Sequence, residues 1–116
     1  MPAINLASKL ASFSEHWSPR IVSHFNGCNV MVVKAAGEFV WHSHPDTDDF
    51  FLVLKGRLTI QLRDGEVHLG PGDLHVVPRG VEHRPVAEGE VHLLLIEPTG
   101  TPNTGNDTTA AVKMTI

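Results

Sequence analysis

Three histidines and an aspartate combine residue types and spacing that suit a metal site. His42 and His44 are separated by one residue, so on an extended strand both side chains project to the same face. Asp49 follows them, and His83 lies further along the chain. Imidazoles joined by one carboxylate form a ligand set that suits Fe, Mn, Ni, Co or Zn. Because two histidines at this spacing also occur by chance, the surrounding elements must decide whether the four side chains meet.

Turn-forming residues define the elements that would position these side chains. Pro78 and Gly80 predict a tight corner, and His83 emerges just past it at the head of a strand. Asp49 opens another predicted strand, which would place its carboxylate beside the strand that carries the two histidines. We therefore expect ligands from different strands to converge.

Short β-rich runs separated by glycine and proline make up most of the chain. Asn26-Gly27 predicts a tight hairpin, and later turns recur at intervals of roughly 8–12 residues, which favours a β-sandwich or barrel over βαβ units. The predicted strands are Arg20–Phe25, Cys28–Ala35, Glu38–His42, Asp49–Leu54, Arg57–Leu62, Glu66–Leu69, Leu74–Val77, Arg84–Ala87 and Val91–Ile96.

The two ends of the chain differ from this β-rich centre. Residues 5–13 carry apolar side chains at helical spacing after Asn5, a good N-cap, and predict a short amphipathic helix. After Glu97 the periodicity ends and Thr, Gly, Asn and Pro dominate. We expect a helical lead-in over residues 1–19, one β domain over 20–97 and an irregular tail over 98–116.

Composition excludes several classes of protein. The formal net charge of −4 and the lack of Lys or Arg runs argue against nucleic-acid binding. The single cysteine, Cys28, permits no intramolecular disulfide. No apolar run approaches the roughly 20 residues that span a bilayer, and the start lacks a secretory signal pattern. We therefore expect a cytoplasmic protein that acts away from membranes.

Two segments resemble the sequence motifs of the cupin superfamily. The first runs from Gly37 through His42-Ser43-His44 and Asp49 to Gly56, and the second from Gly72 through Pro78-Arg79-Gly80 to His83. They stand in the family's order with a short spacer, as in small single-domain cupins. The resemblance implies an all-β fold, a cupin jelly-roll β-barrel with a short N-terminal helix.

The resemblance also implies a set of metal ligands, namely His42, His44, Asp49 and His83. The family usually has glutamate where this chain has Asp49, which is one methylene shorter. Asp49 either binds the metal directly or holds a metal-bound water or a ligand histidine. Asp48 is a competing neighbour, although the spacing to Gly56 favours Asp49.

Alternation along the strands predicts which other side chains surround the site. Phe51 and Val53 share parity with Asp49 and are candidate cavity walls. The opposite face of this strand is also apolar, so the N-terminal helix, a second sheet or a partner subunit should cover it. Trp41 has the opposite parity to the histidines and should pack outside the barrel. His75 and His92 are weaker candidates for the cavity.

Three imidazoles and a carboxylate leave open positions on one divalent transition metal ion, which is a property of catalytic or ligand-binding sites. The chain resembles the small mannose-6-phosphate isomerase-like cupins, which implies an enzyme that acts on a small polar molecule such as a sugar or organic acid. Isomerase and dioxygenase chemistry both fit, and the alternative is a non-catalytic binding or sensing module. No general base stands out, although Arg79, Glu82 and Arg84 lie near the second motif. We also expect a homodimer.

Overall fold

A computed structural model describes residues 2–116 of the chain. It contains one short helix, α1 (Leu6–Leu10), and the seven strands β1 (Arg20–Phe25), β2 (Cys28–Glu38), β3 (Asp49–Leu62), β4 (Gly65–Leu69), β5 (Leu74–Val77), β6 (His83–Pro98) and β7 (Met114–Thr115). Asn5 caps α1 as predicted, because its side chain accepts a hydrogen bond from the backbone N–H of Ser8 at 2.9 Å. The helix is shorter than the predicted span and ends at Leu10.

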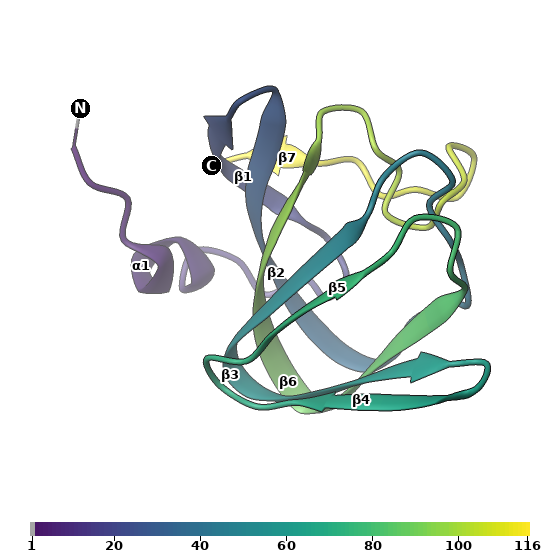
Figure 1. Cartoon of the computed structure of the whole chain (residues 1–116). Helices are drawn as coiled ribbons and strands as arrows, with labels where there is room; N and C mark the ends of the chain where they lie inside the picture. Colours follow the sequence, from purple (N-terminus) through teal and green to yellow (C-terminus); the bar gives the residue numbers. More distant parts are fainter. Residues whose placement is uncertain (1) are drawn as a thin grey trace.

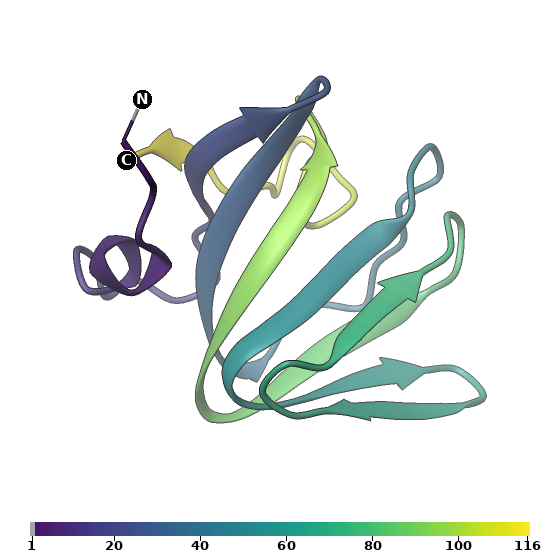
Figure 2. The same ribbon diagram turned by 60° about the vertical axis from the view of Figure 1, so that its left-hand side comes forward.

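The strands form one strongly curved sheet in the order β4-β3-β6-β2-β1-β7, and β5 pairs with the first part of β3 (Figure 1). All pairs are antiparallel except the short parallel pair of β1 with β7. Figure 2 shows how the sheet curves round on itself, with α1 lying outside it. The all-β jelly-roll prediction is confirmed, but no hydrogen-bonded pairing among the described residues closes the sheet into a complete barrel.

The structure merges strands that the turn signals had divided. Residues 49–62 form one strand through Gly56, and residues 83–98 form one strand through Gly89. The register of β3 against β6 shifts on both sides of Lys55, so these glycines accompany bulges instead of ending the strands. A Cβ at Gly56, where φ is +86°, would lie 3.0 Å from the carbonyl oxygen of Glu90. The glycine therefore permits the close approach of β3 and β6.

The segment that carries His42 and His44 is not the separate strand that we predicted. Strand β2 continues to Glu38, and only His42 beyond it forms an isolated bridge, with His83. These two residues exchange backbone hydrogen bonds of 3.0 and 2.9 Å. This one bridge aligns the segment with the start of β6, although the segment is not a regular strand beyond Glu38.

The two faces of the sheet carry separate apolar clusters. The inner cluster includes Phe51 and Val53, so both side chains point inward as predicted, but of the two only Phe51 lines the pocket described below. A smaller cluster on the outer face packs Leu10 of α1 and Leu54 of β3 with buried residues of β1 and β2. The N-terminal helix therefore covers part of the second apolar face of β3.

The C-terminal segment returns to the body of the protein. Strand β7 pairs with the start of β1, and the ammonium group of Lys113 contacts both the carboxylate of Glu97 and the carbonyl oxygen of Thr101. Residues between Pro98 and β7 form turns without regular strand structure. None of the described helices is long and apolar enough to cross a membrane.

Candidate metal centre

The fold brings His42, His44, Asp49 and His83 together, each from the end of an element. His42 and His44 follow β2, Asp49 is the first residue of β3, and His83 is the first residue of β6. One potential ligand atom from each residue lies within 4.8 Å of all the others. All four side chains are buried, and His83 is only 1% exposed. The group has the composition and the spacing to hold one metal ion.

The carboxylate of Asp49 lies at the centre of this group. Its Oδ2 atom is 2.7 Å from Nε2 of His83, 3.2 Å from Nε2 of His44 and 3.8 Å from Nε2 of His42. Three imidazole nitrogens therefore face one carboxylate oxygen. The shorter side chain of aspartate still reaches the histidines, because β3 begins at this residue and places its Cα beside them.

Two of the imidazole rings are oriented by the same local contact. Nδ1 of His42 donates a hydrogen bond of 2.8 Å to the carbonyl oxygen of Val40, and Nδ1 of His83 donates one of 2.9 Å to that of Val81. A neutral imidazole with its proton on Nδ1 presents a lone pair at Nε2. Backbone carbonyls commonly orient metal-binding histidines in this way.

These lone pairs give a test of whether a metal fits the residues present. In neutral His83 the Nε2 atom is an acceptor, yet it lies 2.7 Å from a carboxylate oxygen, which is also an acceptor. Two buried acceptors at this distance need a cation between or beside them, either a proton or a metal ion. Nε2 of His42 and of His44 face the same oxygen, so the donor set fits a divalent transition metal.

Burial and hydrogen bonding act in opposite directions on Asp49. Burial by itself raises the pKa of the Asp49 carboxyl, but the imidazoles of His42, His44 and His83 that surround it outweigh burial and hold that pKa well below its usual range. The side chain is therefore a carboxylate at neutral pH, as metal coordination requires.

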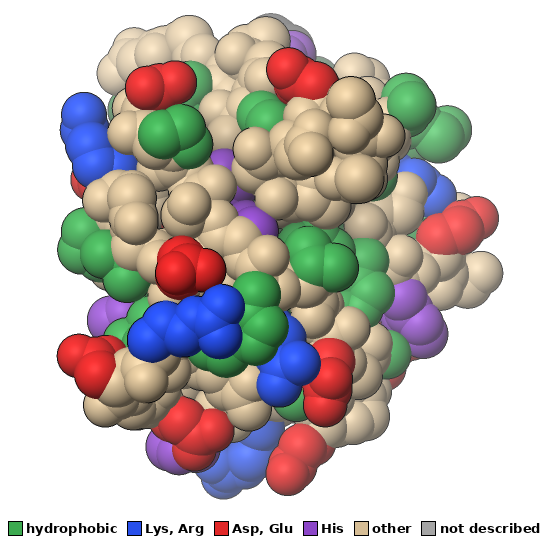
Figure 3. Space-filling model, turned by 90° about the vertical axis from the view of Figure 1, so that its right-hand side faces the viewer, with side chains coloured by type: hydrophobic (Ala, Val, Ile, Leu, Met, Phe, Trp, Pro, Cys, Tyr) green, Lys and Arg blue, Asp and Glu red, His purple; other side chains and the backbone are tan. Residues whose placement is uncertain are grey.

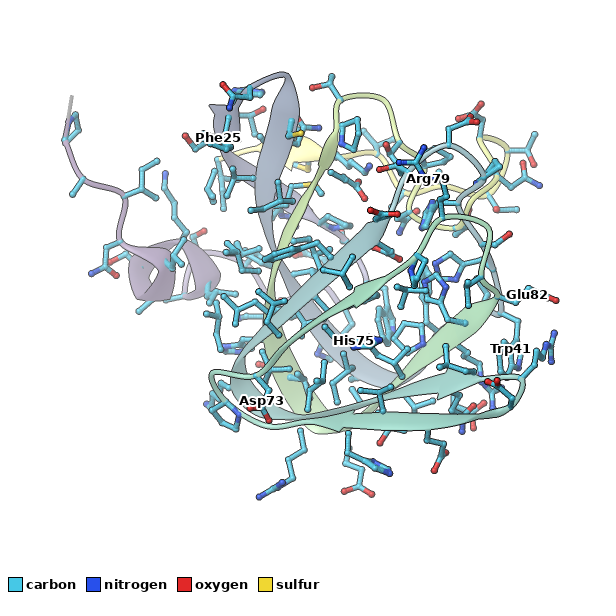
Figure 4. The ribbon with its side chains drawn as sticks, in the orientation of Figure 1. Phe25, Trp41, Asp73, His75, Arg79 and Glu82 are labelled. Atoms are coloured by element: carbon cyan, nitrogen blue, oxygen red, sulfur yellow. The ribbon has the colours of Figure 1, made fainter. Side chains whose placement is uncertain are left out.

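Asp48 and the charged residues of the second motif lie outside the group. Asp48 is exposed, and its Oδ1 accepts a hydrogen bond of 3.0 Å from the backbone N–H of Arg79. Glu82 pairs with Arg63, and Arg84 bonds Gln61 and Glu38. Figure 4 shows Arg79 and Glu82 on the outside of the molecule. None of the three second-motif residues lines the pocket beside the metal centre.

A mostly apolar pocket lies beside the metal centre. His42, His44 and Asp49 form one part of its wall, and the aromatic part is formed by Trp17, Phe39 and Phe51. The space-filling view shows histidine side chains in a hollow at the centre of one face (Figure 3). The hollow thus lies directly beside the buried side chains of the candidate metal site.

Two polar side chains lie on the pocket wall away from the histidines, Glu97 and Asn103. Burial raises the pKa of Glu97, while the ion pair with Lys113 opposes that shift. The Oδ1 atom of Asn103 accepts a hydrogen bond of 2.9 Å from the backbone N–H of Ala111. Both side chains are thus engaged with the C-terminal segment.

Several pocket residues lie outside the two motifs, and sequence reasoning missed them. Trp17 comes from the segment before β1, and Glu97 and Asn103 come from the end of β6 and from the tail. Their places depend on long-range packing, for which the local sequence pattern has no signal. The weaker candidates His75 and His92 are not among the pocket-lining residues. Trp41 lies away from the pocket, as predicted, with the guanidinium of Arg63 3.8 Å from its ring centroid (Figure 4).

Comparison with known proteins decides the family. Residues 29–97 match the Cupin_2 family, described as a cupin domain. The chain belongs to the cupin family. A cupin-2 domain containing protein from Shewanella frigidimarina has a similar crystal structure, with 45% sequence identity and a TM-score of 0.81, over 82% of this cupin and 93% of that chain.

Two further relatives show how far the similarity extends. The uncharacterized protein YdbB of Bacillus subtilis is 39% identical over 64 residues, which span 54% of this cupin and 57% of YdbB. Hydroquinone 1,2-dioxygenase from Sphingomonas sp. TTNP3, solved with 4-hydroxybenzoate bound, has 17% identity and a TM-score of 0.68, over 93% of this cupin and 75% of that chain. At that identity the dioxygenase shares the fold alone.

Proposed function

We propose that this cupin binds one divalent transition metal ion (Fe, Mn, Ni, Co or Zn) through His42, His44, His83 and Asp49, and acts as a metal-dependent enzyme on a small oxygen-bearing molecule. The observation that carries the proposal is the convergence of three imidazole Nε2 atoms on one buried carboxylate beside an open pocket. When bound, the metal supplies a Lewis acid with open positions for an oxygen ligand.

The protein's own residues perform three tasks in this proposal. The carbonyl oxygens of Val40 and Val81 hold two imidazole rings in the orientation that coordination needs. Asp49 contributes a negative charge that offsets part of the charge of the cation. The apolar walls, which include Phe51, keep water away from the ligand and strengthen the electrostatic interactions inside the pocket.

The pocket favours oxidation over sugar isomerisation as the reaction class. An isomerase needs a base within hydrogen-bond reach of the proton that it moves. The one carboxylate on the pocket wall besides Asp49 belongs to Glu97, and Lys113 occupies it. An oxygenase makes a smaller demand on protein bases. A non-catalytic binding module, which needs only the metal and the walls, is the second candidate.

Oxygen uptake by Fe²⁺-loaded protein tests the reaction class. We expect oxygen consumption with catechol and no conversion of glucose or glucuronate. Conversion of the sugars without oxygen uptake would favour the isomerase. Micromolar binding of one of these compounds with no turnover of any would favour the binding module.

Asp49→Asn tests whether this side chain coordinates the metal directly. Because asparagine keeps the shape but loses the charge, we expect metal affinity to fall by at least roughly 10–100-fold. The matched control is Asp48→Asn, which removes the neighbouring charge at an exposed position. Competition titration with a metal indicator measures both variants. An affinity for Asp49→Asn within twofold of that of the wild type would show that Asp49 is not a direct ligand.

The outer face of β3 and β5 supports the proposal of a homodimer. Leu74 and Val76 of β5 are 52% and 39% exposed, and they pair with Leu52 and Phe50 of β3 on the same face. A contiguous exposed apolar patch is typical of an interaction surface.

Sedimentation velocity at micromolar concentration tests the dimer. We expect a dimer for the wild type and a shift toward monomer for Leu74→Glu, because the variant places a charge on the apolar face. Val112→Glu is the control, since Val112 lies in the tail and is 82% exposed. A monomeric wild-type protein would refute the proposal.

A further inference from the structure

The pocket wall beside the candidate metal site is largely aromatic and aliphatic. The rings of Phe39 and Phe51 contact the histidines of the candidate metal site. The Phe39 ring is nearly perpendicular to the His42 ring, with a centroid distance of 5.3 Å, and the Phe51 ring is nearly perpendicular to the His83 ring, with a centroid distance of 6.0 Å. Leu93 and Leu95 of β6 add to the same wall. A ligand held at the metal position therefore extends against aromatic and aliphatic surfaces.

Trp17 extends this aromatic surface from outside the β domain. Its ring stacks on Phe39 with a centroid distance of 4.7 Å and an interplanar angle of 30°. The indole N–H donates a hydrogen bond of 2.8 Å to the carbonyl oxygen of Ala36, so the one polar atom of the ring is occupied by the protein. The part of Trp17 on the pocket wall is thus available for apolar contact.

The backbone holds Trp17 in a conformation that bulky residues rarely adopt. Its φ is +55°, in the left-handed region. The backbone N–H of Trp17 donates a hydrogen bond of 2.8 Å to the carbonyl oxygen of Lys34, along an edge of β2 that β1 leaves free. Such strain at a non-glycine residue persists where the surrounding structure enforces it, and it is common at ligand-binding positions.

The pocket wall away from the histidines offers few polar groups to a sugar. A sugar carries a hydroxyl group on nearly every carbon, and each buried hydroxyl without a partner weakens binding. On the wall away from the histidines, Glu97 accepts from Lys113 and Asn103 accepts from Ala111. The wall therefore disfavours a ligand with hydroxyl groups along its whole length.

From these contacts we infer that the substrate class is a planar aromatic molecule with its oxygen donors at one end. The oxygen end faces the metal centre, and the ring lies along the wall formed by Phe39, Phe51 and Trp17. Trp17 and Phe39 are specificity-determining residues in this arrangement. This inference rests on the proposed metal site and adds the chemical class of the molecule that binds there.

Three carboxylates test the inference on protein loaded with redox-inert Zn²⁺. Benzoate has a planar aromatic body, cyclohexanecarboxylate a saturated apolar body and gluconate a hydroxylated chain. Titration calorimetry should show benzoate bound most tightly and gluconate at least about tenfold more weakly, which corresponds to about 1.4 kcal/mol. Equal affinities, tighter binding of gluconate or binding of none of the three would overturn the inference.

Substitutions of Trp17 and Phe39 test whether these two rings cause the preference for benzoate. Trp17→Ala and the gentler Phe39→Leu should each weaken benzoate binding by roughly 2–10-fold, the range of an aromatic contact, and leave gluconate binding unchanged. Trp41→Ala is the matched control, because Trp41 lies outside the pocket. Unchanged benzoate affinity in Phe39→Leu and in folded Trp17→Ala would overturn the role of these rings.

The zinc content of the protein distinguishes a failure of this inference from a failure of the proposed function. Close to one Zn²⁺ ion per chain should bind to the wild type and to all three variants, because none of the replaced residues is a proposed metal ligand. Zinc-loaded protein that does not prefer benzoate would overturn the aromatic substrate class alone. Protein that binds no Zn²⁺ would overturn the proposed metal site, and this inference with it.

Discussion

Replacing His83 with alanine is expected to abolish metal binding. His83 is the most buried member of the group and lies closest to the Asp49 carboxylate. The variant removes one of three imidazoles and leaves a cavity that no neighbouring ligand atom fills. Altering a residue that only supports a ligand typically costs 10–100-fold in metal affinity, so we expect the loss of a ligand to exceed about 100-fold.

Elemental analysis of untagged protein measures this effect directly. The wild type should carry close to one transition metal ion per chain, and His83→Ala and His42→Ala should carry almost none. His24→Ala is the control, because His24 is an exposed residue of β1. Circular dichroism establishes that each variant is folded. Full occupancy in both ligand variants would refute the metal site.

The histidines of the site were predictable because their signal is local. His42 and His44 lie two apart, and His83 follows a corner defined by Pro78 and Gly80. The structure brings these three histidines and Asp49 within 4.8 Å of one another, as the two motifs predict. The pairing of His42 with His83 also shows how the two motifs meet although the first segment is no regular strand. A single bridge between the two motifs is sufficient to align them.

The course of the long strands was less predictable. Gly56 and Gly89 indicated turns between strands, because glycine with positive φ is common in turns. In the structure both glycines have positive φ but lie within continuous strands β3 and β6. Long-range pairing between the two strands overrides the local turn signal. Local sequence alone does not distinguish a bulge from a turn.

The pocket wall was the least predictable part of the site. Trp17 reaches the pocket because the segment before β1 follows the free edge of β2, and Glu97 is fixed by Lys113 of the tail. Neither contact has a periodicity or a spacing that a sequence pattern could indicate. The candidate ligand atoms are thus encoded locally, whereas the pocket wall beside them depends on the packing of both ends of the chain.

The tail itself lies against the segment that carries His42 and His44, and Gly105 is the residue that permits this contact. A Cβ at Gly105 would lie 2.3 Å from the carbonyl oxygen of Ser43, the residue between His42 and His44. Nothing larger than glycine fits there unless the tail moves. The ion pair of Lys113 with Glu97 holds the segment from its other end. The tail is thus expected to cover one side of the candidate metal site, and it is held there by these two contacts and by the pairing of β7 with β1.

Gly105→Ala is expected to displace this cover and to speed the loss of metal to a chelator. Gly100→Ala is the matched control, because Gly100 also has positive φ but a Cβ there would have no heavy atom within 4 Å. Both variants carry the conformational penalty of alanine at positive φ, roughly 1 kcal/mol. Only Gly105→Ala adds the overlap with Ser43. A reduction of about 1.4 kcal/mol in the barrier to metal release would raise its rate roughly tenfold.

Stopped-flow transfer of Zn²⁺ to a chromogenic chelator measures the release rate in the wild type and in both variants. We expect a rise of about tenfold for Gly105→Ala and little change for Gly100→Ala. Equal rates in the two variants would show that the contact with Ser43 does not restrict access to the metal. Because neither glycine supplies a ligand atom, a rate increase confined to Gly105→Ala assigns the effect to the position of the tail.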